Sequence, residues 1–386
     1  MGFKKNNVDN LNKDNKKTIN NPDKTSWKES PYLIIKGFLM GSADIVPGVS
    51  GGTMALITGI YDRLIHAIKS ADQHVLLNVL KLKFGRVVEY FHWKFLFLLF
   101  SGIIGAVFFF TKIVPLQIYM FTHPEIVYGL FFGLIVGSIV LLLVEISPEN
   151  RRWANIFPLV AGALFGFWIV TLVPTDTPES FWFVMLSGSI AICAMILPGI
   201  SGSYLLLILR KYEYILTQVG NLGTVDTISG LVNLVPFFLG AAVGIILFSR
   251  VLSWLLNHYH ATTLLVLIGF LIGSLYVIWP WQDREFQESV RSEEVLEYND
   301  PVVQEILNRE EPPNLPEYKR ISRIQNSGAA FDSMKRVEVE TVSRKLLTTK
   351  PFIPGEDRGN VNVTGGVFGM GGGLMMILFI AYLRKT

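Results

Sequence analysis

Residues 47–65 read PGVSGGTMALITGIYDRLI, and residues 198–216 read PGISGSYLLLILRKYEYIL. Each stretch opens with Pro-Gly, a branched apolar residue, Ser and Gly, and each lies inside a long apolar segment. Proline removes a backbone donor and clashes with the preceding helical turn, while glycine and serine lower helix propensity further. Both stretches therefore predict a helix that breaks in the middle of an apolar segment.

The apolar segments around these motifs indicate a membrane protein. Hydrophobic residues make up 51% of the 386 residues and charged residues only 17%, whereas a typical soluble domain has about 25% charged residues. A membrane-spanning helix needs ~20 apolar residues at 1.5 Å rise each. Eight apolar blocks stand out, at roughly 31–65, 94–115, 124–146, 153–174, 181–209, 231–255, 261–281 and 363–383.

The two blocks that contain the motifs do not fit a single crossing. Each piece of the first block would be ~22 Å long as a helix, which is short of the ~30 Å hydrocarbon core. A re-entrant hairpin fits better, with its broken backbone covered by protein or by a water-filled cavity. The chain is basic on both sides of this block, and basic loops favour the cytoplasm. We expect six crossings and two hairpins, with both termini and residues 66–93 in the cytoplasm.

Three matches in the same order relate the two halves of the chain. PGVSGG at 47–52 matches PGISGS at 198–203, FTK at 110–112 matches FSR at 248–250, and GLIVGS at 133–138 matches GFLIGS at 269–274. Three crossings per unit would invert the second copy. We therefore predict an all-α polytopic membrane protein with an inverted-topology repeat, each unit being one re-entrant helical hairpin plus three transmembrane helices. Such repeats with broken helices are typical of transporters, and we expect the two broken tips to meet.

Five segments follow from this division. They are a polar cytoplasmic tail (1–30), the first membrane repeat (31–174), the first part of the second repeat (181–282), a polar extracytoplasmic insert (283–360) and the last transmembrane helix (361–386). Within the insert, VEVETVS at 337–343 alternates at strand period. The composition of the insert leaves open whether it is a small domain or disordered.

The motifs have the chemistry to hold an anion away from bulk water. A helix N-terminus offers free N–H groups and about half a positive charge. Glycine lets the backbone approach a ligand closely, and hydroxyl groups add donors. The candidate substrate-binding residues of the motifs are Ser50, Gly51, Gly52, Thr53, Ser201, Gly202 and Ser203. The alternative is that these small residues only allow helices to pack closely.

Three charged residues near the motifs extend this candidate site. Asp44 lies in an apolar hairpin, where a carboxylate is costly, and it is the candidate coupling residue, for a proton or a sodium ion. Its counterpart in the second repeat is Met195, so the site is asymmetric. Arg63 and Arg210 follow the motifs and are candidate phosphate clamps. The alternatives are a helix cap for Asp44 and topology markers for the arginines.

The paired motif resembles the bacterial polyprenyl-phosphate transporter family, long catalogued as a domain of unknown function. The resemblance covers roughly residues 31–282 and the last helix, and the insert departs from a compact version of the family. It implies recycling of undecaprenyl phosphate, the carrier lipid, by a multi-pass protein of the bacterial cytoplasmic membrane. The expected partners are then this lipid and the bilayer, with no cofactor.

Other classes of function have less support in the sequence. The net charge of +3 is too small to indicate nucleic acid, and the single Cys193 excludes an intrachain disulfide and a thiolate metal cluster. A transporter or channel for a small anion remains an alternative. An intramembrane enzyme such as a lipid phosphatase is the weakest alternative, because we find no catalytic nucleophile arrangement and no metal motif.

Overall fold

A computed structural model describes residues 25–46, 49–70, 81, 91–146, 156–174, 177–221, 223, 227–309, 311–325, 336–355 and 361–385. Pro47 and Gly48 of the first motif, the tail 1–24 and most of the basic loop 66–93 lie outside the described residues.

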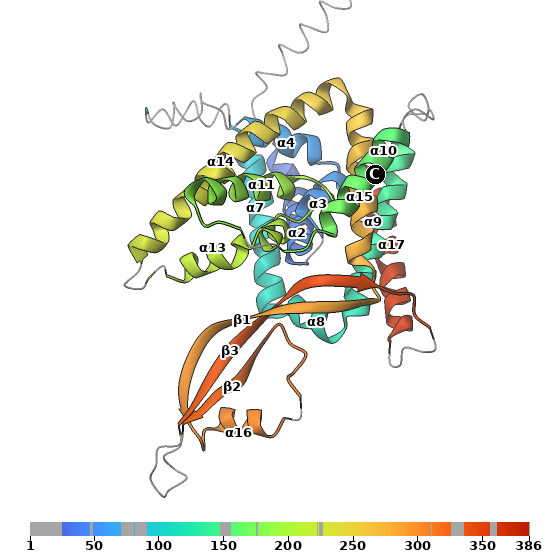
Figure 1. Cartoon of the computed structure of the whole chain (residues 1–386). Helices are drawn as coiled ribbons and strands as arrows, with labels where there is room; N and C mark the ends of the chain where they lie inside the picture. The colour runs from blue at the N-terminus through green and yellow to red at the C-terminus, as the bar shows by residue number, and fades with distance from the viewer. Residues whose placement is uncertain are drawn as a thin grey trace, which may run out of the picture. The chain divides into compact units, whose positions relative to one another are not determined.

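The chain forms two compact units. The first consists of Met1–Phe109, Ser138–Val170 and Thr175–Ser274, and the second of Phe110–Gly137, Thr171–Pro174 and Leu275–Thr386. Both motifs lie in the first unit, and the insert lies in the second (Figure 1). The site can therefore be described within the first unit alone.

The first unit contains two matching runs of three helices. The first run is α2 (Ser30–Ile45), α3 (Gly51–Ile57) and α4 (Tyr61–Lys69), preceded by the short helix η1 (Trp27–Glu29). The second run is α11 (Phe181–Ile196), α12 (Gly202–Ile208) and α13 (Lys211–Gly220). Their lengths are 16, 7 and 9 residues in the first run and 16, 7 and 10 in the second. The predicted break at each motif is confirmed.

A second break in each run was not predicted from the sequence. The first run breaks again at Gly59, which has φ +69°, and the second at Arg210, which has φ +51°. A left-handed residue ends a helix, and glycine adopts that conformation without steric cost. Each motif-bearing block is therefore three helical pieces, whereas the sequence indicated two half-length pieces for the first block.

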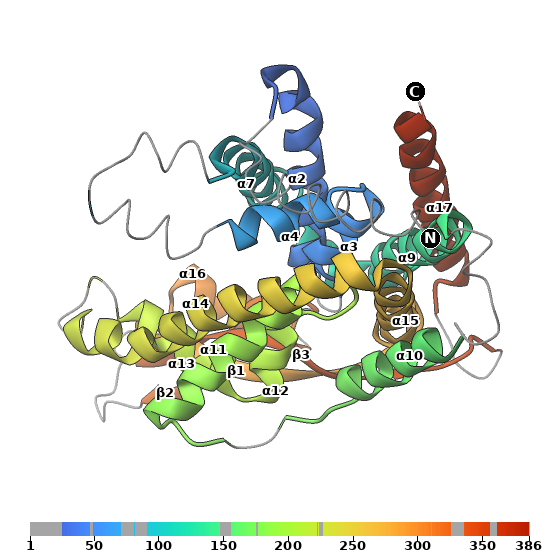
Figure 2. The same ribbon diagram turned by 90° about the horizontal axis from the view of Figure 1, so that it is seen from above.

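The long helix of each run packs on one further helix through glycines. α2 packs on α7 (Trp93–Phe108), where a Cβ on Gly41 would lie 2.7 Å from Ile103 O. α11 packs on α14 (Thr227–His258), where a Cβ on Gly244 would lie 2.8 Å from Ser189 O. Figure 2 shows both pairs from above. Such backbone-to-backbone contact is typical of helices in membranes.

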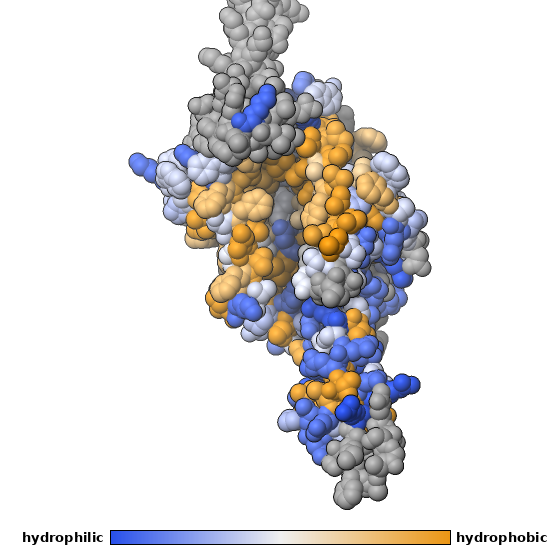
Figure 3. Space-filling model, turned by 90° about the vertical axis from the view of Figure 1, so that its left-hand side faces the viewer, coloured by the Kyte–Doolittle hydropathy of each residue, from blue (hydrophilic) through white to orange (hydrophobic). Residues whose placement is uncertain are grey.

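Five helices are long and apolar enough to cross a membrane: Trp93–Ile113, Pro124–Val144, Thr227–His258, His260–Ile278 and Val363–Ala381. They correspond to five of the six predicted crossings. The first of these spans ends in a π-helical turn, η2 (Phe109–Ile113), and the others belong to α9 (Pro124–Glu145), α14, α15 (His260–Ile278) and α17 (Val363–Lys385). The sixth crossing contains α10 (Ile156–Val170), which has 15 residues. Figure 3 shows apolar side chains over much of one face of the helical part.

The insert is a folded sheet, so the all-α prediction is wrong for this segment. β1 (Gln282–Glu297), β2 (Glu317–Gln325) and β3 (Arg336–Pro351) form an antiparallel sheet in the order β1-β3-β2. Val303 of α16 (Pro301–Leu307) packs on Val337 and Val339 of the central strand. The alternation at 337–343 is therefore that of a strand, but a small core built with α16 could not be read from it.

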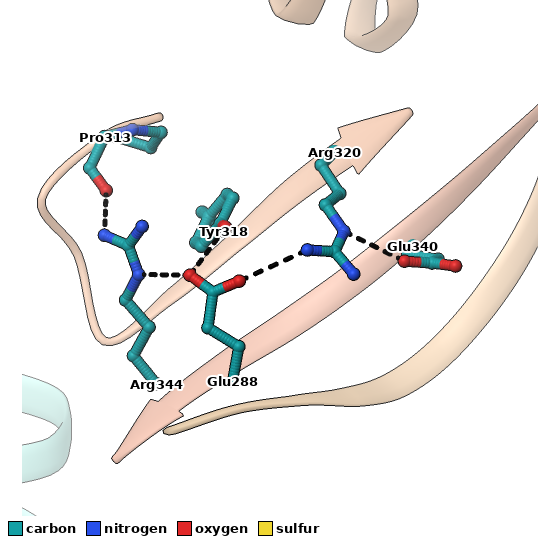
Figure 4. Close-up of polar contacts among 6 residues, drawn as sticks. All are labelled: Glu288, Pro313, Tyr318, Arg320, Glu340 and Arg344. Atoms are coloured by element: carbon teal, nitrogen blue, oxygen red, sulfur yellow. Dashed lines mark hydrogen bonds and ion pairs between the residues drawn. The ribbon is translucent and has the colours of Figure 1, made fainter. Parts of the chain in front are cut away.

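A network of charged side chains ties the three strands together (Figure 4). Glu288 of β1 accepts from Arg344 Nε of β3 at 2.9 Å, and from Tyr318 Oη and Arg320 Nη1 of β2 at 3.0 and 3.2 Å. Arg320 Nε also donates to Glu340 at 3.0 Å. The hydrogen bond from Arg344, which is the largest effect, lowers the pKa of Glu288 below its usual value.

Candidate functional site

The two motifs are in direct contact. Ser50 Oγ, in the first motif, lies 3.2 Å from both Met195 O and Leu197 O, which immediately precede the second motif. Its single hydrogen is shared between these two carbonyl oxygens, while its lone pair accepts from Gly52 N at 3.2 Å. This contact joins residues 145 and 147 positions apart in the sequence. The predicted meeting of the two tips is thus confirmed.

A second hydrogen bond strengthens this contact. Thr53 Oγ1 accepts from Gly199 N at 3.0 Å, and the Thr53 side chain is completely buried. Gly199 has φ +79°, a conformation that favours glycine. A Cβ on Gly52 would lie 2.5 Å from Ile196 O, so glycine is also needed where the two backbones approach. We call this set of contacts, made by Ser50, Gly52 and Thr53 with residues 195–199, the motif joint.

The motif joint bears on the role predicted for the first motif. Ser50 and Thr53 were expected to donate hydroxyl hydrogens to a phosphate, but in this structure both hydroxyl groups hold the second motif. The close-packing alternative therefore describes these residues in the observed state. A role in phosphate binding would require the motif joint to open.

The Asp44 side chain accepts a hydrogen bond from the backbone amide of Gly51. Its Oδ1 accepts from Gly51 N at 2.6 Å. A Cβ on Gly51 would lie 2.6 Å from Asp44 Oδ2. Asp44 therefore caps the helix that follows the break, as the capping alternative held. The carboxyl group of Asp44 thus already occupies the amide where the sequence placed a phosphate.

The second motif differs at the corresponding place. A Cβ on Gly202 would meet Met195 Cγ, just as one on Gly51 would meet Asp44. The predicted pairing of Asp44 with Met195 is therefore visible in three dimensions, and the second motif has a thioether where the first has a carboxylate. For the amides of Gly202 and Ser203, no hydrogen-bond partner is found among the described residues.

Two hydroxyl groups accompany these amides. Ser201 Oγ and Ser203 Oγ are 2.9 Å apart, and the side chain of Ser203 is exposed. Ser201 also caps α12 by accepting from Tyr204 N at 3.5 Å. Among the described residues, the second motif thus combines amides without a partner, hydroxyl groups and no carboxylate contact, which is the better arrangement for binding an anion.

The structure does not bring Arg63 to the motifs. Its Nη1 pairs with Glu29 at 2.9 Å, its Nη2 donates to Thr25 at 2.7 Å, and its guanidinium stacks 4.6 Å from the Phe95 ring centroid. Glu29 precedes α2 and Asp44 lies at its other end, about 22 Å away along a helix of 1.5 Å per residue. Arg63 is therefore held at the opposite end of α2 from the motif.

Arg210 stands at the second helix break of its run. Arg210 is exposed, and its backbone adopts the left-handed conformation just before α13. Gly59 has the corresponding position in the first run. A left-handed non-glycine residue costs roughly 1–2 kcal/mol. The structure thus gives Arg210 an unusual backbone conformation at the start of α13.

Lys211 is a residue whose burial the sequence did not indicate. Its side chain is only 1% exposed, and Nζ donates to Thr177 O at 2.9 Å. The amine also lies 5.6 Å from the Phe183 ring centroid and 5.8 Å from that of Tyr214. Because its side chain is buried, Lys211 is a poor marker of membrane topology.

Comparison with known proteins identifies relatives over most of the membrane part. The family described as undecaprenyl phosphate translocase-like matches residues 40–295. A polyprenyl-phosphate transporter of Vibrio cholerae is 41% identical over 255 residues, which cover 66% of this chain and 78% of that protein. A polyprenyl-phosphate transporter of Staphylococcus aureus is 29% identical over 258 residues, which cover 64% of this chain and 85% of that protein. No solved structure matches the chain.

Proposed function

Because the chain belongs to the undecaprenyl phosphate translocase-like family, we propose that it carries undecaprenyl phosphate, or a related polyprenyl phosphate, across the bacterial cytoplasmic membrane for reuse as a carrier lipid. Both relatives are named as transporters, so the protein is a transporter and not an enzyme. The lipid substrate in those names favours a lipid phosphate over the small anion that the sequence left as an alternative.

The motif joint is the observation that supports a transport mechanism best. Two broken segments from distant parts of the chain meet through a few hydrogen bonds between uncharged groups. Each such bond contributes a net ~0.5–1.5 kcal/mol, so the contact can form and break during a cycle. In our proposal each run of three helices is a re-entrant hairpin, the two runs are inverted relative to each other, and the site opens to each side of the membrane in turn.

We place the phosphate at the second motif. Ser201 and Ser203 offer hydroxyl groups, and the amides of Gly202 and Ser203 are unpaired among the described residues. The first motif completes the site only when the joint opens, and then Ser50, Gly51, Gly52 and Thr53 become available to the ligand. Arg210 contributes its guanidinium in one part of the cycle, while Arg63 stabilises the end of α2.

Asp44 is the group through which transport is coupled to a proton or a sodium ion. The position of Asp44 supports this role, because its carboxyl group accepts a hydrogen bond from the Gly51 amide beside the motif joint. An incoming phosphate and the Asp44 carboxylate would repel each other at this amide. Neutralising Asp44 by a proton or a cation removes that repulsion and frees the amide for the substrate.

Translocation of a labelled polyprenyl phosphate in proteoliposomes tests the proposal. Wild-type protein is expected to translocate the lipid, and the double variant Ser201→Ala with Ser203→Ala is expected to lose most of this rate. Ser101→Ala is the matched control, because the Ser101 hydroxyl is exposed and donates only to Phe97 O of its own helix, at 2.7 Å. Absence of transport by the wild type would refute the function. Equal rates in the double variant and the control would refute the site.

A further inference from the structure

In the first run, the third helix is tied to the segment that precedes the long helix. Arg63, the third residue of α4, pairs with Glu29 at 2.9 Å and donates to Thr25 at 2.7 Å, and both partners precede α2. The guanidinium also stacks 4.6 Å from the ring centroid of Phe95. α4 therefore returns to the end of α2 at which the run begins. We call these contacts of Arg63 the first clasp.

In the second run, Lys211 makes the corresponding contacts from the first residue of α13. Its Nζ donates at 2.9 Å to Thr177 O, which precedes α11, and Thr177 Oγ1 donates to Leu209 O between α12 and α13. The amine lies 5.6 Å from the ring centroid of Phe183 in the first turn of α11. Glu179 is close enough to interact with its charge. We call these contacts the second clasp.

The two clasps combine the same four kinds of group, namely a cation, a threonine, a glutamate and an aromatic ring. The sequence match between the runs, continued from the motifs, sets Arg63 opposite Tyr214 and Lys211 opposite Ile60. The two cations therefore come from different positions of the repeat, so similarity between the halves does not account for both. A requirement that both runs share explains why each has a clasp.

Each clasp lies far from the motif joint but is connected to it by a long helix. Glu29 is about 22 Å from Asp44 along α2, and Phe183 is about 18 Å from Met195 along α11. An α-helix of this length bends little, so the position of its clasped end determines where its other end lies. Loosening a clasp therefore displaces the broken tip of that run from the motif joint.

We propose that Arg63 and Lys211 are positioning residues for transport, each clasp keeping the two ends of its run together throughout the cycle so that the run moves as one body. The proposal rests on the proposed function, because it assigns both residues a part in transport. Rigid-body movement of one repeat against the other is how inverted-repeat transporters expose a site to each side in turn. The clasps then act on the rate of this movement and not on the affinity for the lipid.

The two clasps differ in strength. The Arg63 and Glu29 side chains are 37% and 46% exposed, so water screens their pairing, whereas Lys211 is 1% exposed. Removing a hydrogen bond from a buried charged group costs more than removing an exposed ion pair. Lys211→Met should therefore lower the maximum rate of transport about ten- to a hundred-fold, and Arg63→Gln about two- to tenfold.

Translocation of a labelled polyprenyl phosphate at several lipid concentrations, in proteoliposomes with matched amounts of inserted protein, separates rate from affinity. In both variants, the lipid concentration that gives half the maximum rate should change less than about threefold. Glu29→Arg combined with Arg63→Glu restores the ion pair and should recover most of the lost rate. Arg291→Gln is the matched control, because Arg291 pairs with Glu317 at 3.0 Å in the insert with similar exposure. Its rate should stay within about twofold of the wild type.

A second measurement tests whether the first clasp stays closed during the cycle. In a Cys193→Ser background, Glu29→Cys combined with Arg63→Cys should transport slowly, and joining the two thiols with a short bifunctional reagent should raise the rate. A block of transport on joining would overturn the proposal, because the clasp would then have to open. If Lys211→Met fails to insert, Thr177→Val removes a hydrogen bond of the second clasp with little change in shape, and a wild-type rate in that variant would overturn the second clasp.

Wild-type rates in both Arg63→Gln and Lys211→Met would overturn the proposal. A weaker affinity at an unchanged maximum rate would also overturn it, because these residues would then contact the substrate. A charge-swapped protein no faster than Arg63→Gln would show that the pairing is not the cause of the loss and would overturn the first clasp. All of these outcomes are measured against transport by the wild type, so a failure of the clasps is distinguishable from a failure of the proposed function.

Discussion

Replacing Thr53 by valine tests whether the motif joint stabilises the fold. Valine has almost the same shape as threonine and a similar helix propensity, so the change removes one hydroxyl group from a completely buried position. It leaves Gly199 N–H, which Thr53 Oγ1 accepts at 3.0 Å, buried without that partner. An unpaired buried donor costs about 1–3 kcal/mol. The equilibrium between the joined and separated motifs should therefore shift about 5- to 150-fold towards separation.

Thr58→Val provides the matched control. Thr58 is also buried in the first unit, but its hydroxyl donates to Met54 O, 2.7 Å away in the same segment. Met54 O keeps the backbone hydrogen bond from Thr58 N at 2.9 Å, so no buried group loses its only partner. We expect a change of less than about 0.5 kcal/mol in the free energy of unfolding.

The free energy of unfolding of both variants can be measured by titration with SDS in mixed micelles. Thr53→Val should be the less stable by at least about 1 kcal/mol, with the same secondary-structure content before unfolding. A Thr53→Val protein as stable as the wild type would refute the argument. Equal losses in the two variants would also refute it, because the loss would then follow from removing any buried hydroxyl.

Three further predictions concern the charged residues and the topology. Asp44→Asn keeps an oxygen that can accept from Gly51 N, so the variant should insert and fold normally. It should nevertheless lose transport in proteoliposomes. Near-normal transport would remove Asp44 from the coupling mechanism. Arg210→Gly should raise the free energy of unfolding by about 1 kcal/mol, because glycine adopts φ +51° without strain, and a loss of transport in the same protein would assign the guanidinium to the substrate. In a Cys193→Ser background, a cysteine at position 81 should react only with reagents that enter the cytoplasm and one at position 324 with external reagents, and external labelling at 81 would contradict the hairpin topology.

A fourth prediction concerns pH and the insert. The folded-state pKa of Glu288 is depressed by its hydrogen bond from Arg344, so its ionised form stabilises the sheet above the usual glutamate value of 4.5 and this contribution is lost as the pH falls below it. The contribution is small, about 1 kcal/mol or less, because the group is partly exposed. Proteolysis of the insert should therefore accelerate between pH 5 and about pH 3 more in the wild type than in Glu288→Gln. Equal acceleration in both would contradict the assignment.

The sequence was sufficient to predict the breaks, the pairing of the two motifs and their contact. Proline and glycine act locally, so a repeated Pro-Gly-x-Ser-Gly pattern predicts both breaks directly. The atoms that make the contact were not predictable, because Ser50 bonds main-chain carbonyl groups at 195 and 197, and a main-chain group has no residue-specific signal. The position of Arg63 was also missed, since its partners Thr25 and Glu29 are brought near by the path of α2 and not by sequence spacing.

For the strands of the insert, too, the sequence predicted local structure but not the long-range contacts. Alternation at 337–343 indicated a strand, but the pairing of β3 with β1 and β2 depends on residues up to 69 positions away, Gln282 facing Pro351.

The motif joint is chemically one-sided. The first motif contributes side chains, the hydroxyl groups of Ser50 and Thr53, whereas the second contributes only main-chain atoms of residues 195, 197 and 199. Mutation can delete a hydroxyl group, but every amino acid has a carbonyl oxygen. During evolution the joint therefore restricts positions 50 and 53 to hydroxyl-bearing residues while leaving Met195 and Leu197 free to drift. At this contact, sequence change is therefore restricted more on the side of the first motif than at residues 195 and 197.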